Sequence, residues 1–524
     1  MQKIHKIQNY LYIFIIIVTA FTVNTIIASR GVFPIDTFVH YDSGYRILLG
    51  EYPVKDFWIV HGFLIDFIQS IFFKILGVNW FAYVSHASVF NVFIALFSYL
   101  IFKELKIDKT ICFILSLLIS FLAYPVSGTP FLDLHSNYFG LFAVYFAIFS
   151  IIKKSYAKWF YVSFFLCLSF FSKQVPSAYI ILGVTIFNLF ITIHKREIKF
   201  FYYYLAGGLF SLILLIIFLI LLDVSLKQFI LQLIQFPSSV GVNRYGNYEL
   251  GIKNLFLDFK FIHLFFFPII FLNFYFIIKK KNYFNSNEFN IFILISIYTL
   301  STLIHQIYTQ NQIYIFSTVP ILTGFLIFYL KGVFNFKNNY FLIIIIVSST
   351  LITYKYHLRF NIDRKFHELN KTELNNAIDA SSIDISLKGL QWISPYFKDP
   401  NKEIQIINNF IEMLKKDKKN KIVITEYNFI SSTLKKSVFT PSRTFDGISY
   451  PLKDTIYYDE YKNYLINIIK SNNIKSIYTF DKNEIDIENI NHRVFNYVSK
   501  NCFDVNRINA YVKKLDIKTC KDLN

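Results

Sequence analysis

Ionisable side chains crowd one short segment of an otherwise apolar chain, residues 40–62, which read HYDSGYRILLGEYPVKDFWIVHG. This segment follows the first long apolar run and holds carboxylates, histidines, an arginine and a lysine. A carboxylate can act as a general base, and cations or donors can stabilise negative charge that develops in a reaction. A loop that only joins two membrane spans needs neither, so the segment indicates a functional site.

The composition excludes a soluble globular protein. Of 524 residues, 54% are hydrophobic and 20% aromatic, and the mean hydropathy is +0.43. Repeated runs of Ile, Leu, Phe and Val predict an α-helical polytopic membrane protein. The net charge of +19 would suggest nucleic acid in a soluble protein, but here the basic residues flank apolar runs. Membrane topology and anionic lipid explain that charge better, so we expect no nucleic-acid partner.

About eleven transmembrane helices are predicted, at 11–28, 81–102, 111–124, 138–152, 159–172, 175–193, 201–222, 261–278, 289–304, 314–330 and 339–354. Basic residues fall on alternate loops, at 3–6, 103–109, 153–158, 195–199, 279–281 and 331–337. The positive-inside rule makes these loops cytoplasmic. The N-terminus is then cytoplasmic, and both the 40–62 loop and everything after residue 355 are extracytoplasmic. The run from Leu11 has no cleavage site and reads as an anchor in a bacterial plasma membrane.

Two features of the outer side predict where a cavity lies. Segments 63–76 and 224–236 are apolar but short, and we expect both to be amphipathic helices at the outer interface. Spans 111–124 and 159–172 are roughly 21 Å long at 1.5 Å per residue, against a hydrocarbon core of ~30 Å. Irregular polar chain at that depth is tolerated where it lines a protein cavity. The loops that follow these spans contain four candidate cavity residues, Asp133, His135, Lys173 and Gln174.

Residues 355–524 change character. Strand-like runs such as KIVITEYNFI and IKSIYTF alternate with helical stretches such as YDEYKNYLINIIKSN. We therefore divide the chain into a transmembrane domain, 1–354, and a small extracytoplasmic α/β domain, 355–524. Cys502 and Cys520 both fall in the second domain, where an oxidising compartment would let them form a disulfide.

The pattern Asp42-Ser43-Gly44, followed by Ile47 to Trp58, ILLGEYPVKDFW, resembles the first external loop of bacterial GT-C glycosyltransferases. That family includes protein O-mannosyltransferases and aminoarabinose transferases. Phe171 to Gln174 is similar to a Lys-Gln element between its middle spans, and His305 to Pro320 resembles its late segment rich in His, Tyr and Pro. The resemblance covers most of residues 1–354, in order and on one face of the membrane.

The resemblance implies an inverting transferase that moves a sugar from a polyprenyl-phosphate carrier to a cell-envelope acceptor, whether glycan, lipid or protein, on the outer side. On that basis Asp42 is the expected general base, and Arg46, one helical turn beyond it, should keep it ionised. Substrate and phosphate contacts are expected from Lys173 above all, and from Arg46, Lys55, His61, Gln174 and His305.

The sequence departs from the family pattern at two places. Ser43 stands where many relatives have a second carboxylate, and His61-Gly62-Phe63 replaces a Lys-Pro-Pro element. Asp133 is the alternative second carboxylate. The sequence assigns no cofactor. It leaves open whether a divalent cation binds, and the candidate ligands for one are Asp42, Asp133 and His135.

Other interpretations stand beside these. Asp42 could cap a helix over 43–50, Asp56 could pair with Lys55 or Arg46 and shape the loop, and Lys173 could snorkel to the interface. The chain as a whole could be a transporter or flippase of lipid-linked or envelope precursors, or a catalytically inactive membrane scaffold. The sugar, the acceptor and the length of the lipid carrier are not encoded in recognisable motifs.

Overall fold

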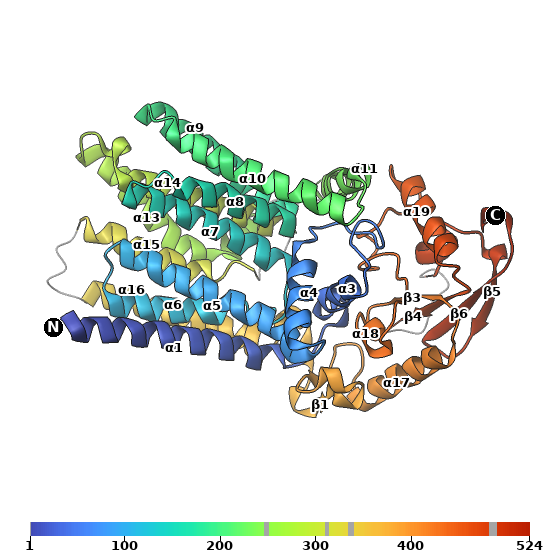
Figure 1. The fold of residues 1–524 in the computed structure, drawn as a ribbon. Coiled ribbons are helices and arrows are strands. Elements are labelled where there is room, and N and C mark those ends of the chain that lie inside the picture. The colour runs from blue at the N-terminus through green and yellow to red at the C-terminus, as the bar shows by residue number, and fades with distance from the viewer. Residues whose placement is uncertain (1, 246–250, 310–313, 334–339, 482–489, 524) are drawn as a thin grey trace. The chain divides into compact units, whose positions relative to one another are not determined.

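A computed structural model describes residues 2–245, 251–309, 314–333, 340–481 and 490–523 of the chain (Figure 1). Residue 339 of the predicted span 339–354 and residues 310–313 of the segment His305 to Pro320 lie outside this description. The chain forms two compact units, which we describe separately. The helical unit comprises Met1–Ala28, Val84–Ile217 and Arg244–Phe366, and the mixed unit comprises Ser29–Tyr83, Phe218–Asn243 and His367–Asn524.

The helices confirm a helical polytopic membrane protein. In the described part of the chain, eight helices are long and apolar enough to cross a membrane. They are α1 (Gln2–Ala28), α5 (Trp80–Glu104), α7 (Leu132–Lys153), α9 (Gln174–Lys195), α10 (Lys199–Leu221), α13 (Lys260–Lys279), α14 (Asn287–Thr309) and α16 (Tyr340–Tyr356). Three shorter apolar helices are α6 (Lys109–Leu122), α8 (Lys158–Ser172) and α15 (Thr318–Lys331). Each of the eleven predicted spans falls on one of these helices, but only eight meet the length expected of a span.

Burial separates the centre of the helical unit from its surface. Helix α7 is buried on nearly every side, although its sequence is as apolar as that of its neighbours. Helix α10 instead exposes large aliphatic side chains along its length, among them Leu209, Ile213 and Ile220. A helix that is apolar all round and exposed is suited to hydrocarbon rather than to water. Helix α10 therefore faces lipid, while α7 forms the core.

The mixed unit is built around a four-stranded sheet, in the order β3-β4-β6-β5. Its strands are β3 (Lys421–Thr425), β4 (Ser476–Phe480), β6 (Val512–Ile517) and β5 (Phe503–Arg507). β3 and β4 are parallel, and the other neighbours are antiparallel. Helices α17 (Pro400–Lys416) and α19 (Tyr458–Ser471) cover opposite faces (Figure 1). The strands alternate accordingly, since Ile477 joins the core under α19 while Tyr478 contacts Phe410 of α17. The predicted α/β character of this region is confirmed.

Two segments that precede residue 355 fold with the C-terminal region. Between α3 (Val39–Leu48) and α4 (Leu64–Leu76), the Trp58 N–H donates to the Pro441 carbonyl at 2.9 Å. The Trp58 carbonyl accepts from the Arg443 N–H at 3.0 Å. The Trp58 ring packs edge-on against Phe236 and Tyr461. The compact units therefore do not follow the linear division at residue 355, because these polar and aromatic loops find their partners in the sheet domain.

The two predicted amphipathic segments are helical. In α4 the polar face is buried and the apolar face is exposed. Its polar side chains Asp66, Gln69 and Ser70 are buried, whereas Ile71 and Ile75 are 54% and 74% exposed. A helix at a water-exposed surface would present the opposite faces. Segment 224–236 forms α11 (Leu226–Ile230) and a following π-helical turn, Leu231–Gln235. The exposed apolar side of α4 is therefore suited to contact with lipid.

A disulfide joins Cys502, just before β5, to Cys520, after β6. Eighteen positions separate the two cysteines along the chain, and β5 and β6 lie between them. The bridge thus closes the two edge-side strands of the sheet into one covalent loop.

We expect the disulfide to block two of the four cysteines and to stabilise the mixed unit by about 2–4 kcal/mol, because it constrains the unfolded chain. Thiol labelling of the denatured, unreduced protein should then detect two thiols, those of Cys112 and Cys167. The control Cys112→Ala/Cys167→Ala should give no labelling before reduction. Two reactive thiols in this control would contradict the bridge.

Candidate functional site

A buried carboxylate, Asp66 on α4, lies at the centre of the mixed unit's polar cluster. It is fully buried and accepts hydrogen bonds from His40 Nδ1 at 2.6 Å, Ser43 Oγ at 2.5 Å and Arg443 Nη2 at 2.5 Å. Burial alone would raise the pKa of Asp66, but Arg443 and His40 outweigh burial and hold that pKa below its usual value. Burial in turn lowers the pKa of His40, so a neutral imidazole donates to an ionised carboxylate.

The approach of α3 to α4 requires glycine at one position of the Asp42-Ser43-Gly44 motif. A Cβ atom on Gly44 would lie 2.7 Å from Cγ of Gln69, closer than real side chains come. Ser43 is buried and donates to Asp66. A carboxylate at that position would face Asp66 directly and repel it, so the structure favours a hydroxyl group there.

Asp42, the predicted base, lies within α3 and is partly exposed. Helix α3 begins at Val39 after its N-cap residue Phe38, so the alternative role of Asp42 as a helix cap is wrong. Its Oδ1 accepts a hydrogen bond from Ser431 of α18 (Ile430–Leu434). Burial raises the pKa of Asp42 to about 6, although Arg46 and the Ser431 hydrogen bond both oppose that rise.

Arg46 is predicted to support Asp42, but its hydrogen bonds go to other groups. Its Nε donates to Glu51 Oε2 at 2.6 Å, its Nη1 to the Thr440 carbonyl at 2.8 Å, and its guanidinium lies 4.2 Å from the Phe57 ring centre. The side chain is 2% exposed. Its charge still lowers the pKa of Asp42, but less than burial raises it. Arg46 therefore shapes the loop and is not available for a phosphate.

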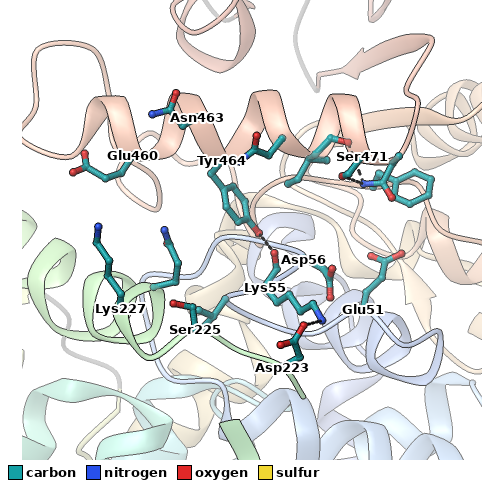
Figure 2. Close-up of a pocket in the computed structure, with 16 residues that line it drawn as sticks. Glu51, Lys55, Asp56, Asp223, Ser225, Lys227, Glu460, Asn463, Tyr464 and Ser471 are labelled. Atoms are coloured by element: carbon teal, nitrogen blue, oxygen red, sulfur yellow. Dashed lines mark hydrogen bonds and ion pairs between the residues drawn. The ribbon is translucent and has the colours of Figure 1, made fainter. Parts of the chain in front are cut away.

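Lys55 lies in a pocket of the mixed unit, while His61 is half-buried in the loop before α4. In Figure 2 the Lys55 ammonium reaches Asp223, with Nζ and Oδ2 3.0 Å apart. Asp56 does not pair with Lys55 or Arg46 through its carboxylate. Instead its Oδ2 accepts from the Tyr52 N–H at 2.7 Å, which supports the structural reading of Asp56 by a different contact.

The helical unit holds a second network, and it joins three of the predicted site residues. Lys173 Nζ lies 2.7 and 2.8 Å from the two carboxylate oxygens of Asp133, and His305 Nε2 lies 2.8 Å from Oδ1. Asp133 lies in the first turn of α7, Lys173 lies between α8 and α9, and His305 belongs to α14. The Lys173 carbonyl accepts from Ser177 at 2.7 Å, which secures the break between α8 and α9. Gln174 is the first residue of α9.

His135 turns away from this network. It lies two residues after Asp133 on α7, a spacing that directs side chains to different sides of a helix. Its Nε2 is 2.9 Å from that of His86, and its Nδ1 contacts the Tyr124 hydroxyl. Within the described ranges, no three His, Cys, Asp or Glu side chains are grouped to hold a metal ion. Asp133 and His135 thus do not converge on one cation.

Sequence reasoning did not single out Asp66, Arg443 or Ser431 as site residues. Asp66 left a weak signal, because it is a carboxylate inside an apolar segment. Ser431 and Arg443 left none, since each lies more than 370 positions from its partner. No protein-family model and no curated protein matches this sequence.

Removing the cation from the helical network should destabilise the protein, because Asp133 would be left buried without its ammonium partner. We expect Lys173→Met to cost about 3–5 kcal/mol, and Lys173→Met/Asp133→Asn to recover most of that loss. Thermal unfolding of the protein in nanodiscs measures both. Lys154→Met, which removes an exposed lysine at the end of α7, is the matched control. A Lys173→Met variant as stable as wild type would show that the pair does not form.

Proposed function

We propose that this protein is a membrane glycosyltransferase that moves a sugar, with inversion, from a polyprenyl-phosphate donor to a cell-envelope acceptor on the outer side of the plasma membrane. The observation that carries the proposal is the environment of Asp42. Asp42 is a partly exposed residue, its carboxylate accepts a hydrogen bond from Ser431, and burial of that carboxylate raises its pKa to about 6. A general base works best when its pKa lies near the operating pH, and such a group is still mostly ionised at neutral pH.

The proposed orientation has eleven spans, with the eight long helices and α6, α8 and α15 all crossing. Support comes from a pocket of about 560 Å³ in the helical unit, lined by Lys6, Lys103 and Lys109 together with polar residues. Nearby, Lys331 Nζ donates to the Lys106 carbonyl at 3.1 Å. These lysines come from three separate segments that the positive-inside rule makes cytoplasmic. Their convergence supports an N-terminus inside and a C-terminal region outside, where a disulfide would persist.

We propose that Lys173 binds the donor phosphate. Asp133 holds the ammonium group in place without occupying all of its donors. An ammonium group has three N–H donors. Two of the Lys173 donors reach the Asp133 oxygens, and the contacts within the described residues leave the third for a ligand. A lysine positioned in this way can contact a phosphate oxygen without leaving its carboxylate partner.

The same network also favours a second candidate function, transport. Ionisable residues at a break between two membrane helices are a feature of translocation pathways. The two functions differ in their products. A transferase converts a polyprenyl-phosphate sugar into free polyprenyl phosphate and a glycosylated acceptor, whereas a transporter moves its cargo intact. Proteoliposomes loaded with labelled donor and acceptor separate them.

In that assay we expect Asp42→Asn to reduce sugar transfer by about 10²–10⁴-fold, the usual loss when a general base is removed. Asn keeps the shape and hydrogen bonding of Asp but cannot accept the proton. Asp454→Asn is the matched control, because Asp454 is an exposed carboxylate in a loop of the same unit. If Asp42→Asn transferred sugar normally while Asp133→Asn did not, the base would lie in the helical unit.

The pH dependence provides a separate prediction. Transfer requires ionised Asp42, so kcat/KM should fall as the pH drops through about 6. Because the Ser431 hydrogen bond lowers the pKa of Asp42, Ser431→Ala should move this acid limb to higher pH. The adjacent Ser432 donates to the Phe429 carbonyl at 2.7 Å, and Ser432→Ala should leave the limb in place. An unchanged limb in Ser431→Ala would contradict Asp42 as the titrating base.

A further inference from the structure

The mixed unit contains a pocket of about 510 Å³ that none of the roles above requires. Figure 2 shows α19 along one wall, with the segments around Lys55 and Asp223 opposite it. Pockets of about 300–1,000 Å³ are typical of small-ligand sites. This pocket therefore has room for a ligand the size of one or a few sugar rings.

One face of α19 supplies most of the wall. The residues that face the pocket recur every three or four positions, as neighbours on one helix face do: Glu460, Asn463, Tyr464, Asn467 and Ser471. The opposite face packs Tyr461, Leu465 and Ile469 into the core of the unit. The core side thus fixes the helix, and the polar side is left to face the pocket.

The charges on the wall do not suit an anion. The pocket is lined by four carboxylates and only two lysines, Lys55 and Lys227. Lys55 is paired with Asp223, and Glu51 is paired with Arg46. The remaining charged groups are Lys227, Asp56 and Glu460, which are on balance negative. A phosphate would meet net repulsion here, so the pocket is distinct in chemistry from the lysine site proposed for the donor.

The uncharged groups suit hydroxyls. Asn463 and Asn467 are exposed, and neither side chain makes a hydrogen bond within the described part of the protein. Each amide offers both a donor and an acceptor, and a sugar hydroxyl can also donate and accept. Ser225 and Gln228 add similar groups on the facing side. The wall can therefore satisfy a ligand that is rich in hydroxyls and carries no net charge.

Tyr464 is held in position in the middle of this wall. Its hydroxyl donates to the Lys55 carbonyl at 3.1 Å, and its ring packs edge-on against Trp58, with 5.6 Å between ring centres. An aromatic side chain fixed at both ends offers a rigid, largely apolar surface beside polar groups. The C–H face of a sugar ring fits such a surface.

We propose that this pocket binds a neutral carbohydrate. The proposal rests on the proposed function only in naming that carbohydrate as the acceptor. Glu51 in the wall accepts a hydrogen bond from Arg46, which lies one helical turn after Asp42 on α3. A sugar held in the pocket thereby lies beside Glu51, whose partner Arg46 is on the same helix as the proposed base.

The test is binding of full-length protein in nanodiscs to an array of neutral, amino-sugar and uronic-acid oligosaccharides. We expect wild type to retain neutral members, and Asn463→Ala/Asn467→Ala to lower the affinity about tenfold through the loss of two neutral hydrogen bonds. Alanine is a better helix former than asparagine, so α19 stays folded. The matched control is Asn409→Ala, an exposed asparagine on α17 outside the pocket.

Retention of no neutral glycan by wild type would overturn the proposal, as would equal affinity of the double variant. Displacement of a bound glycan by 10 mM inorganic phosphate, about the level that saturates millimolar anion sites, would also overturn it by showing an anion site. Failure of the pocket and failure of the transferase are distinguishable. Protein that consumes polyprenyl-phosphate sugar but retains no glycan disproves only the pocket. Protein that retains glycan but leaves the donor intact disproves only the transferase.

Discussion

The mixed unit depends on one buried charge, the carboxylate of Asp66. Taking a carboxylate out of water costs several kcal/mol unless partners replace its hydration. Here His40 and Ser43 from α3 and Arg443 from the C-terminal region supply three hydrogen bonds. The interaction therefore joins segments that are far apart in sequence, and the charge is tolerated only when all of them are in place. It explains why the loop after the first span folds with the sheet domain.

Two carboxylates of the same unit are driven in opposite directions by their surroundings. Asp66 has an arginine and two further donors, and its pKa is lowered. Asp42 has a serine donor and an arginine whose hydrogen bonds go to Glu51 and Thr440, and its pKa is raised to about 6. Surroundings that push the pKa values of two acids apart give the two groups different roles. The contrast fits a structural role for Asp66, and a raised pKa is what the role proposed for Asp42 requires.

The parts of the fold that depend on local pattern could be predicted from the sequence. Long apolar runs became helices, and the apolar runs at 421–425 and 476–480 became the parallel strands β3 and β4. The pairing of charges could not be predicted, because it depends on which segments meet in three dimensions. The i,i+4 spacing predicted an ion pair between Asp42 and Arg46. Instead, Arg46 pairs with Glu51, and Asp42 accepts a hydrogen bond from a hydroxyl group 389 positions away. Lys173 was expected to face a ligand, and it also meets Asp133. A sequence shows which residues can ionise, but tertiary contacts decide which of them remain reactive.

The density of charge in segment 40–62 is therefore mainly structural. His40, Arg46, Glu51 and Asp56 all engage protein groups that hold the loop. Asp42 is a partly exposed residue whose carboxylate accepts from Ser431. Helix α4 adds a reason for the position of that carboxylate. Its polar side is buried around Asp66, and its apolar side is exposed. Contact of that apolar side with lipid would hold α3, which is bonded to α4 through Asp66, close to the membrane surface. In the transferase proposed above, this position would place Asp42 near the membrane surface, where the phosphate of a lipid-linked donor lies.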